Sequence, residues 1–430
     1  APSDPRLRDL EVRRCQQALR LAWYSSAPMA PFEAALARAQ EDWERLDPED
    51  PIRTALAAQS LADRAMRTYL KDRDAEPDVR AALALADQSL SRSAHVKEAL
   101  QAQAQAHWVR AAEGMHGRGE VGTSFEQALA CIRKALAEAP GDLYTWDLLS
   151  RIHRFRFIHA IQHGAEVMAS FEEARRDLEA LSADPALGNL RGYHLAMLRT
   201  VLASGLQGQG RPSGEALDPG ITDLEAICRS RPADNVARFH LGSALLMRGQ
   251  DQTRTRIQRA DDLKAAFDNY DRARQANINS FESHWGLMLA AEYRLEILRD
   301  LHRDTREART QFRAALDHLR VLLPTHWARW EGEASYAYQM GRDAASPAQA
   351  EAFYLEAEKA ITQAVRANPG ARQLYQWRAR IQGALMDFPA RYASARAAAL
   401  RALDHVEALQ PGDAQAIALR KEVLAQPPPK

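Results

Sequence analysis

Two histidines four residues apart, His159 and His163, come closest to a metal-binding set in this sequence of 430 residues. Residues at that spacing lie on one face of a helix, so their imidazoles could share a zinc ion. His153 lies about 80 to 120° round the helix from the pair. A shared site would therefore need ligands from another helix, and we expect packed or exposed histidines with no metal and no cofactor.

Arginines gather in the segment RGQDQTRTRIQR, residues 248–259. Guanidinium groups at such spacing could bind an anion or an acidic peptide, although a solvated loop and helix surface would have the same composition. We take three arginines as candidate partner contacts. Arg248 and Arg254 belong to this segment, and Arg238 lies upstream of it.

Motifs of known catalytic centres are missing. The sequence has no GxSxG, no HExxH and no DFG. His302-Arg303-Asp304 spells the HRD of protein kinases, but Arg309 stands where that motif needs a metal-binding asparagine. We predict no catalytic residue and no enzyme, with an all-α enzyme that has a site between helices as the alternative.

The composition is electrically balanced, with 57 Lys plus Arg and 57 Asp plus Glu. No overall positive field attracts nucleic acid, so we expect no nucleic-acid partner. No segment has the roughly 18 apolar residues that a membrane helix needs, and we expect no membrane insertion by this chain. The first and last residues are typical of linkers, which fits a mature protein or an excised domain.

The elements that must carry these residues are marked by prolines at nearly equal intervals. Six prolines follow one another at spacings of 45, 47, 92, 45 and 42 residues: Pro140, Pro185, Pro232, Pro324, Pro369 and Pro411. The longest spacing is two periods and places a boundary at Ile278. Counting backwards adds boundaries at Ala94 and Pro48. Since proline cannot continue a helix, each boundary predicts the end of one helix and the start of another.

A second pattern lies within the units. Ala128, Ile132 and Ala135 stand 12, 8 and 5 residues before Pro140, and Ala357, Ile361 and Ala364 stand at the same distances before Pro369. Small residues seven apart predict a close approach of a neighbouring helix. Each unit also has one large ring after its boundary: Trp146, Tyr193, Phe239, Trp285, Trp330 and Trp377.

This order of small residue, large residue, small residue and proline, followed by an aromatic residue, resembles the tetratricopeptide repeat. The units here are lengthened to about 46 residues, against about 34 in the usual repeat. The resemblance implies an all-α right-handed solenoid of about nine helix pairs in one array. We expect divergent pairs over residues 5–139, regular repeats over 140–411 and a capping helix over 413–425.

A second resemblance is to the repeat arrays that follow the kinase domain in bacterial transmembrane serine/threonine kinases. Lengthened units and the sequence Ala291-Glu292-Tyr293 carry it. It implies a sensor or docking domain of a bacterial signalling protein, placed outside the cytoplasm. The alternative is a free-standing scaffold or co-chaperone-type adaptor, which would favour the cytoplasm. Neither resemblance predicts the oligomeric state.

The ring in each unit has two interpretations. It packs between neighbouring pairs, or it faces the concave groove of the opening helices, the first of each pair, and anchors a protein or peptide. Trp330 lies six residues past its boundary and Trp285 seven, and such shifts turn the rings to different sides. We take Trp285, Trp330 and Tyr293 as candidate contacts for a partner.

Two local expectations complete the prediction. The segment 207–220 is rich in Gly and Pro and should form an exposed, mobile loop. Asp261 and Asp262 should lie at the start of a helix, where carboxylates favour the positive end of the helix dipole.

Overall fold

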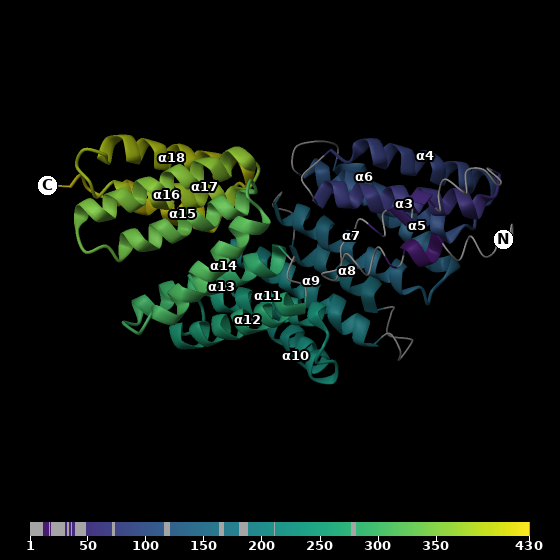
Figure 1. Ribbon diagram of the computed structural model, residues 1–430, viewed down its shortest axis with the longest axis horizontal. Coiled ribbons are helices and arrows are strands. Elements are labelled where there is room, and N and C mark those ends of the chain that lie inside the picture. The colour runs from purple at the N-terminus through teal and green to yellow at the C-terminus, as the bar shows by residue number, and fades with distance from the viewer. Residues whose placement is uncertain are drawn as a thin grey trace. The chain divides into compact units, whose positions relative to one another are not determined.

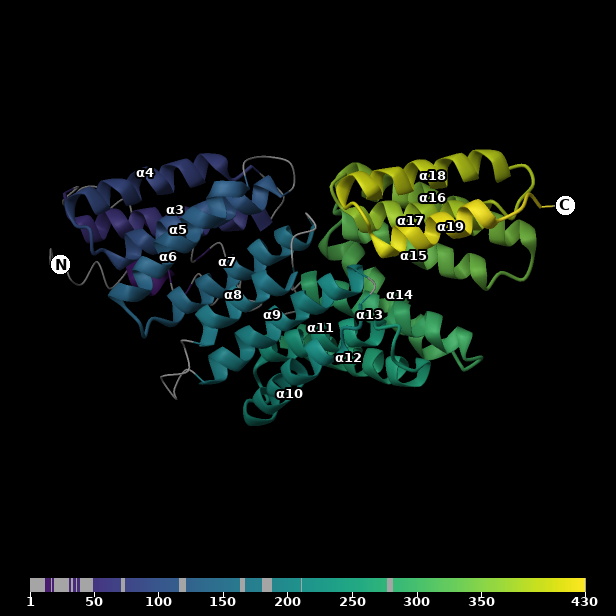
Figure 2. The same ribbon diagram turned by 180° about the vertical axis from the view of Figure 1, so that it is seen from behind.

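The computed structural model describes residues 12–16, 18, 31, 34–35, 37–38, 49–70, 74–115, 121–162, 167–179, 188–209, 211–276 and 281–429. Over these residues the chain forms α-helices joined by turns, and the described part holds no strand. Within each unit, most consecutive helices lie side by side as neighbours (Figures 1 and 2). The predicted all-α array of helix pairs is confirmed.

The chain divides into two compact units, Ala1–His159 and Ala160–Lys430, here unit 1 and unit 2. In unit 1, α3 packs on α4 and α5, and α5 packs on α4 and α6. The pairs expected at 51–92 and 94–139 are present, while the pair expected at 5–46 lies almost wholly outside the described residues. The helices are α3 (Pro51–Leu70), α4 (Glu76–Arg92), α5 (Lys97–Gly114), α6 (Gly122–Glu138) and α7 (Leu143–Gln162), whose last turn crosses into unit 2.

In unit 2 each helix packs on the next, and successive opening helices touch one another from α9 to α19. Its core forms two apolar clusters, one reaching from α9 to α14 and one from α15 to α19. The helices are α8 (Val167–Glu179), α9 (Gly188–Gly208), α10 (Gly214–Ser230), α11 (Asn235–Gln250), α12 (Arg256–Ala276), α13 (Phe281–Asp300), α14 (Arg306–Leu322), α15 (Trp327–Arg342), α16 (Pro347–Ala367), α17 (Arg372–Leu385), α18 (Tyr392–Leu409) and α19 (Ala414–Ala425).

The boundaries work as the proline period predicts. At Pro140, Pro232, Pro324, Pro369 and Pro411 one helix ends two residues before the proline and the next begins three residues after it. Ala94 stands in the same relation to α4 and α5. The residue before each proline is held outside the α region, so it ends the helix. The N–H of that residue still closes the last helical turn. For example, the Ala139 N–H donates to the Ala135 carbonyl oxygen at 3.1 Å.

Side chains early in the opening helices complete these turns. Six residues past the proline, Trp146 Nε1, Arg238 Nε and Tyr375 Oη each donate to the carbonyl oxygen of their own proline, at 2.7, 3.1 and 3.1 Å. Each proline lies in the turn between two helices, outside their backbone hydrogen-bond ladders, and these donors bond its carbonyl oxygen. Part of the aromatic signal in the sequence therefore comes from turn stabilisation.

Small residues allow the close helix approach that their spacing predicts. Ala128, Ala135, Ala357 and Ala364 are fully buried. Gly286 of α13 lies so close to the Tyr270 ring of α12 that a Cβ added there would be 2.4 Å from the ring. Only glycine fits such an approach without movement of the neighbour.

Two local expectations are wrong. The 207–220 loop is short because α10 begins at Gly214, and Pro219 lies inside that helix. Ser213 is buried, and its N–H and Oγ both donate to Asp251 Oδ2 at 3.0 and 2.9 Å, which fixes the turn. Asp262 is not in a first helical turn, since α12 begins six residues earlier at Arg256.

The HRD sequence belongs to the turn that ends α13. His302 has a φ of 54°, the left-handed conformation that usually belongs to glycine after a helix. Its N–H bonds the Arg299 carbonyl at 2.9 Å, and the Arg303 N–H bonds the Leu298 carbonyl at 2.9 Å. This pair of bonds is the Schellman motif of helix ends, so the triplet has a structural role here.

Candidate functional site

One row of side chains recurs along the opening helices. It consists of the residues 7, 11, 14 and 18 positions past each unit boundary, a spacing that keeps them on one helix face. We call this row the stripe. In unit 1 it includes Gln101 and Gln105 of α5, and in unit 2 it includes Glu292 and Glu296 of α13 and Glu331 of α15.

The unit 1 stripe is a network of neutral amides. Gln101 Oε1 accepts from Gln59 Nε2 at 2.7 Å, and Gln101 Nε2 donates to Asp142 Oδ2 and Thr145 Oγ1, both at 2.6 Å. Gln105 donates to the Ala62 carbonyl at 3.1 Å and accepts from the Tyr144 hydroxyl. Both buried glutamines are therefore satisfied within the protein.

The unit 2 stripe instead buries carboxyl groups. Glu292 is 1% exposed and Glu331 3%. Among the described residues, Glu292 Oε1 and Glu331 Oε2 have no hydrogen-bond partner. Burial raises the pKa of Glu331 to about 7. Burial, with the nearby charge of Glu296, raises the pKa of Glu292 well above its usual value. Both groups are thus held toward the protonated form.

A cavity of about 330 Å³ adjoins this region, between α15, α16, α17 and α19. Six of its twelve lining residues stand at stripe positions of the last three units, five of them on opening helices and Asp387 in the turn after α17. Small apolar side chains, among them Ala379, Leu419 and Val423, form part of its wall. The six stripe residues are Tyr338, Arg342, Arg380, Gly383, Asp387 and Glu422.

Two arginines of the cavity hold no counter-ion. Arg342 ends α15 and Arg380 lies in α17, and within the described residues neither makes a hydrogen bond or an ion pair. The Arg380 guanidinium stands 5.3 Å from the centre of the Trp377 ring. Most arginines of unit 2 differ from this pair, as Arg299 does in bonding Asp343 at 2.8 Å. Two free guanidinium groups at one cavity are suited to bind an anion.

Two tyrosines stand beside these arginines. The Tyr338 and Tyr354 rings lie 5.6 Å apart, and neither hydroxyl has a hydrogen-bond partner in the described part of the chain. Burial raises the pKa of Tyr338, and the charges of Arg342 and Arg380 oppose that rise, so both guanidinium groups act on this hydroxyl. The tyrosines therefore remain neutral hydroxyls that can donate to a bound oxygen.

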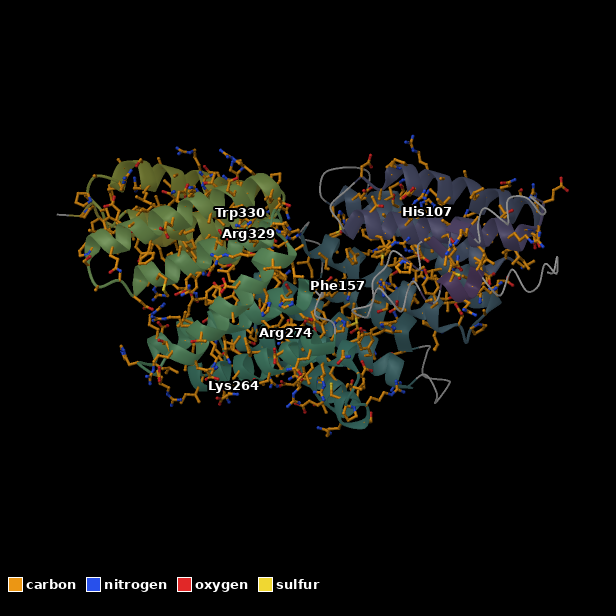
Figure 3. The ribbon with its side chains drawn as sticks, viewed as in Figure 1. His107, Phe157, Lys264, Arg274, Arg329 and Trp330 are labelled. Carbon is orange, nitrogen blue, oxygen red and sulfur yellow. The ribbon has the colours of Figure 1, made fainter. Side chains whose placement is uncertain are left out.

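The predicted rings Trp285, Trp330 and Tyr293 all pack partly against the core of unit 2. The Trp285 ring meets the Trp327 ring edge-on, with centroids 5.7 Å apart. The guanidinium of Arg329 lies 4.2 Å over Trp330, its neighbour on α15 (Figure 3). Each ring is half-buried, and its role as a partner contact stays a prediction.

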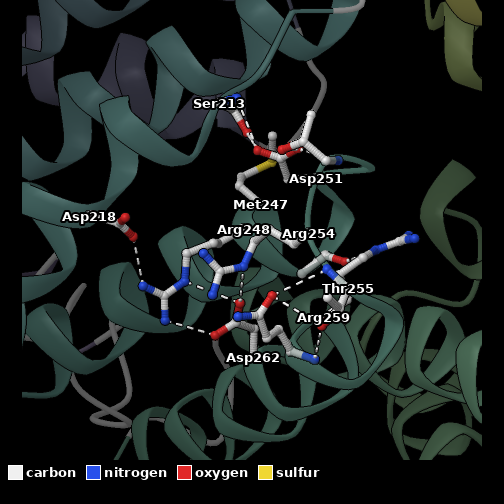
Figure 4. A network of polar contacts seen from close by, with 12 residues as sticks. Ser213, Asp218, Met247, Arg248, Asp251, Arg254, Thr255, Arg259 and Asp262 are labelled. Atoms are coloured by element: carbon white, nitrogen blue, oxygen red, sulfur yellow. Dashed lines mark hydrogen bonds and ion pairs between the residues drawn. The ribbon is translucent and has the colours of Figure 1, made fainter.

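The predicted arginines take part in contacts within unit 2. Arg248 bonds both oxygens of Asp262, at 3.1 and 2.7 Å, and Asp218 at 2.8 Å (Figure 4). Arg254 pairs with Asp262 at 3.3 Å. Arg238 bonds the Pro232 carbonyl. Together these bonds join α10, α11 and α12, and a partner role for the three arginines stays a prediction.

The histidine pair yields no metal site in the described residues. His153 is buried, and His159 packs against the Phe125 ring with centroids 6.1 Å apart. His163 lies outside the described residues. No group of three or more His, Cys, Asp or Glu side chains that could hold a metal ion occurs in the described part of the chain.

Sequence analysis missed the cavity residues, although a signal for them exists. It followed the large rings, which stand six to eight residues past the boundaries. Counting 11, 14 and 18 residues past Pro324 and Pro369 would have selected Tyr338, Arg342 and Arg380. That count cannot show which of these side chains lack a hydrogen-bond or ion-pair partner.

The described helices form an all-α array of helix pairs, as the sequence predicts. No protein family and no curated protein matches the sequence. No helix among the described residues is both long and apolar enough to span a bilayer.

Several solved structures have a similar fold. A tetratricopeptide repeat protein from Parabacteroides merdae is similar over 74% of this chain and 99% of its own, with 14% identity and a TM-score of 0.42. The human IFIT1 dimer with PPP-AAAA is similar over 96% of this chain and 85% of its own, with 14% identity and a TM-score of 0.43. Yeast Tom70 is similar over 98% of this chain and 97% of its own, with 11% identity and a TM-score of 0.27. These similarities concern the fold alone.

Proposed function

We propose that this chain is a non-catalytic scaffold that binds a protein or peptide along the stripe of α13, α15 and α17. The observation that carries the proposal is the set of polar atoms on these helices that lack a partner within the described residues: Glu292 Oε1, Glu331 Oε2 and the guanidinium groups of Arg342 and Arg380. Buried polar groups normally find partners within a protein. Groups that remain open on neighbouring opening helices are suited to a ligand that lies across them.

The half-buried rings give this surface its anchors. Trp285 and Tyr338 are stripe residues of adjacent opening helices, and both are partly exposed. Large rings beside charged groups are the residue types that dominate binding energy at protein interfaces. A role as the sensor or docking domain of a receptor-like bacterial kinase is the finer form of this proposal, and only the sequence resemblance supports it. An adaptor role is its alternative.

Peptide selection tests the proposal without knowledge of the partner. A random peptide library is selected on the full chain, and the affinities of the selected peptides are measured for Trp285→Ala, Tyr338→Ala and Trp330→Ala. Loss of an anchor should cost more than about 2 kcal/mol of affinity. As the control, Leu355→Ala changes an exposed side chain of a closing helix, α16, and should leave peptide binding unchanged.

Melting curves separate a binding role from a packing role. A ring that serves only the core should cost about 3 to 5 kcal/mol of stability when it is truncated and should leave the affinity of the remaining folded protein unchanged. That result at both Trp285 and Tyr338 would refute the proposed site. Single-stranded RNA is tested on the same samples, because the balanced charge predicts no binding. A salt-dependent complex with RNA would contradict the proposal.

A further inference from the structure

The cavity between α15, α16, α17 and α19 has the make-up of a small-molecule site. Its volume of about 330 Å³ falls at the lower end of the range of about 300–1,000 Å³ that such sites occupy. It joins a partly apolar wall to a few convergent polar groups, as small-molecule sites do. Gln426 closes one side of the cavity. Its side-chain amide donates to Asp387 Oδ1 at 2.8 Å, and its backbone carbonyl oxygen accepts from the Tyr392 hydroxyl at 2.9 Å.

We propose that this cavity binds a small organic monocarboxylate, with the carboxylate held by Arg342, Arg380 and the Tyr338 hydroxyl and the apolar body against Ala379, Leu419 and Val423. The two guanidinium groups supply planar pairs of donors that match a carboxylate. They come from neighbouring opening helices, α15 and α17, so a single anion can link them. The inference goes beyond the peptide scaffold and does not depend on it.

The charges of the cavity favour a single negative charge on the ligand. Arg342 and Arg380 contribute two positive charges, and Asp387 and Glu422 contribute two negative ones. Asp387 already accepts a hydrogen bond from Gln426, while Glu422 is exposed and has no partner among the described residues. A dianion such as a phosphate ester would meet repulsion from both carboxylates. A monocarboxylate needs only the two arginines.

The apolar wall favours a body of carbon atoms behind the charge. Val423 is 4% exposed and Ala379 1%, so the apolar surface open to a ligand comes mainly from Leu419 and Ala384, which are partly exposed. Burial of apolar area stabilises a complex by about 25 cal/mol for each Å². Acetate has too little such area, whereas 3-phenylpropanoate combines a carboxylate with a ring that the cavity can hold.

Calorimetry and ligand-observed NMR on the full chain test the proposal. The probes are 3-phenylpropanoate, its uncharged amide, acetate and inorganic phosphate. We expect 3-phenylpropanoate to bind at least tenfold more tightly than each of the other three. Equal binding of the amide would refute the arginine contact. Equal binding of acetate or phosphate would refute the amphipathic monocarboxylate and leave a general anion site.

Variants then place the ligand. Arg342→Ala and Arg380→Ala should each raise the Kd for 3-phenylpropanoate at least tenfold, and Tyr338→Phe should raise it about threefold. Arg401→Ala, which removes an exposed arginine of the closing helix α18, is the matched control and should leave the Kd unchanged. Because neither cavity arginine makes an ion pair in the described structure, all variants should keep the helix content of the parent. An unchanged Kd in both cavity variants would overturn the proposal.

This outcome is separate from that of the peptide scaffold. Both proposals use Tyr338 and Arg380, so Trp285→Ala and Arg342→Ala are the variants that separate them: the first should weaken the peptides alone and the second the acid alone. Binding of 3-phenylpropanoate in a chain that selects no peptide would leave the cavity proposal standing alone. Peptides that bind a chain with no affinity for the acid would refute the cavity proposal only.

Discussion

Gln101 in unit 1 and Glu331 in unit 2 occupy the same place, seven residues past a boundary on an opening helix. Both are buried, at 2% and 3% exposed. The Gln101 amide bonds three side chains of neighbouring helices. One oxygen of Glu331 has no partner in the described structure. The same repeat position therefore carries a buried polar side chain in both units, but in unit 2 one of its oxygens has no hydrogen-bond partner among the described residues.

The difference separates two uses of one helix face. A buried polar network stabilises and specifies a fold when every member is bonded. The side-chain amides of Gln101 and Gln105, which bond groups of α3 and α7, meet that condition. A buried carboxyl oxygen without a partner costs stability. Such a cost at Glu292 and Glu331 is expected where a surface serves binding. The comparison thus indicates that α3 to α7 hold unit 1 together, and it supports the proposed binding surface on α13 to α17.

The largest effect should follow from breaking the amide network of the unit 1 stripe. Gln101→Leu leaves the Gln59 amide without its partner and removes one bond each from Asp142 and Thr145, which still bond each other. Each buried polar group that loses its partner costs about 1 to 3 kcal/mol, so we expect a loss of about 3 to 4 kcal/mol in the free energy of unfolding. Denaturant titration measures it. Gln127→Leu makes the same change at an exposed position of α6 and should stay within about 0.5 kcal/mol of the parent.

The matching change in unit 2 should have the opposite sign at high pH. Glu331→Gln removes a group whose pKa is raised to about 7 in the folded chain, against about 4.3 when unfolded. A raised pKa means that the folded state holds the proton longer, so the parent loses stability as the pH rises from about 4.5 to about 7. We expect the variant to gain up to about 3 kcal/mol relative to the parent at pH 8 and nothing at pH 4.

Hydrogen exchange resolved by peptide shows where this pH effect occurs. In the parent, protection of α13 and α15 should fall between pH 5 and pH 8, after correction for the intrinsic exchange rate. Glu331→Gln should reduce that fall, and Glu356→Gln on the exposed side of α16 should not. If Glu331→Gln destabilised the chain at pH 8 as Gln101→Leu does, the contrast between the two stripes would be wrong.

A third prediction concerns the helix contact behind the unit 2 stripe. Gly286→Ala places a methyl group 2.4 Å from the Tyr270 ring, which is buried. Overpacking of this kind costs about 1 to 3 kcal/mol. Gly383→Ala is the control on α17, because a Cβ there meets nothing within 4 Å, and removal of a helical glycine should stabilise by about 0.5 to 1 kcal/mol. Equal melting temperatures for the two variants would show that α12 and α13 can move apart.

The helix boundaries could be predicted because they depend on single residues. Proline fixes its own φ and restricts the residue before it, so Pro140 and Pro369 each mark a helix end, although Pro219 lies inside α10. Ala128 and Ala135 likewise announce a close contact, because a larger side chain would not fit there. Local rules of this kind, extended by the repeat period to the boundary at Ala94, gave the pairs from residue 51 onward.

The candidate site could not be predicted in the same way. Arg248 and Arg380 are the same residue type on similar opening helices, but Arg248 bonds Asp218 and Asp262 and Arg380 bonds no carboxylate in the described structure. Whether a charge is satisfied depends on residues from other helices that happen to face it. Composition and spacing do not contain that information, so the sequence favoured the crowded arginine segment over the cavity.

The smallest effect tests the turn at the end of α13, the helix that carries Glu292. His302 adopts a φ of 54°, which costs a residue with a Cβ about 1 to 2 kcal/mol. Glycine avoids that cost but loses about 0.5 to 1 kcal/mol through the freedom of the unfolded chain. His302→Gly should therefore stabilise unit 2 by about 0.5 to 1 kcal/mol, measured by thermal melting.

Arg303→Gly is the control for the neighbouring residue, whose φ is not positive. It should destabilise by a similar amount, because only the entropy term applies there. A loss of stability in His302→Gly would mean that the imidazole makes a contact that outweighs its backbone cost. Hydrogen exchange of the Arg303 amide distinguishes the two cases. Since that N–H closes the Schellman turn on the Leu298 carbonyl, its protection should rise in His302→Gly if backbone conformation alone decides the result.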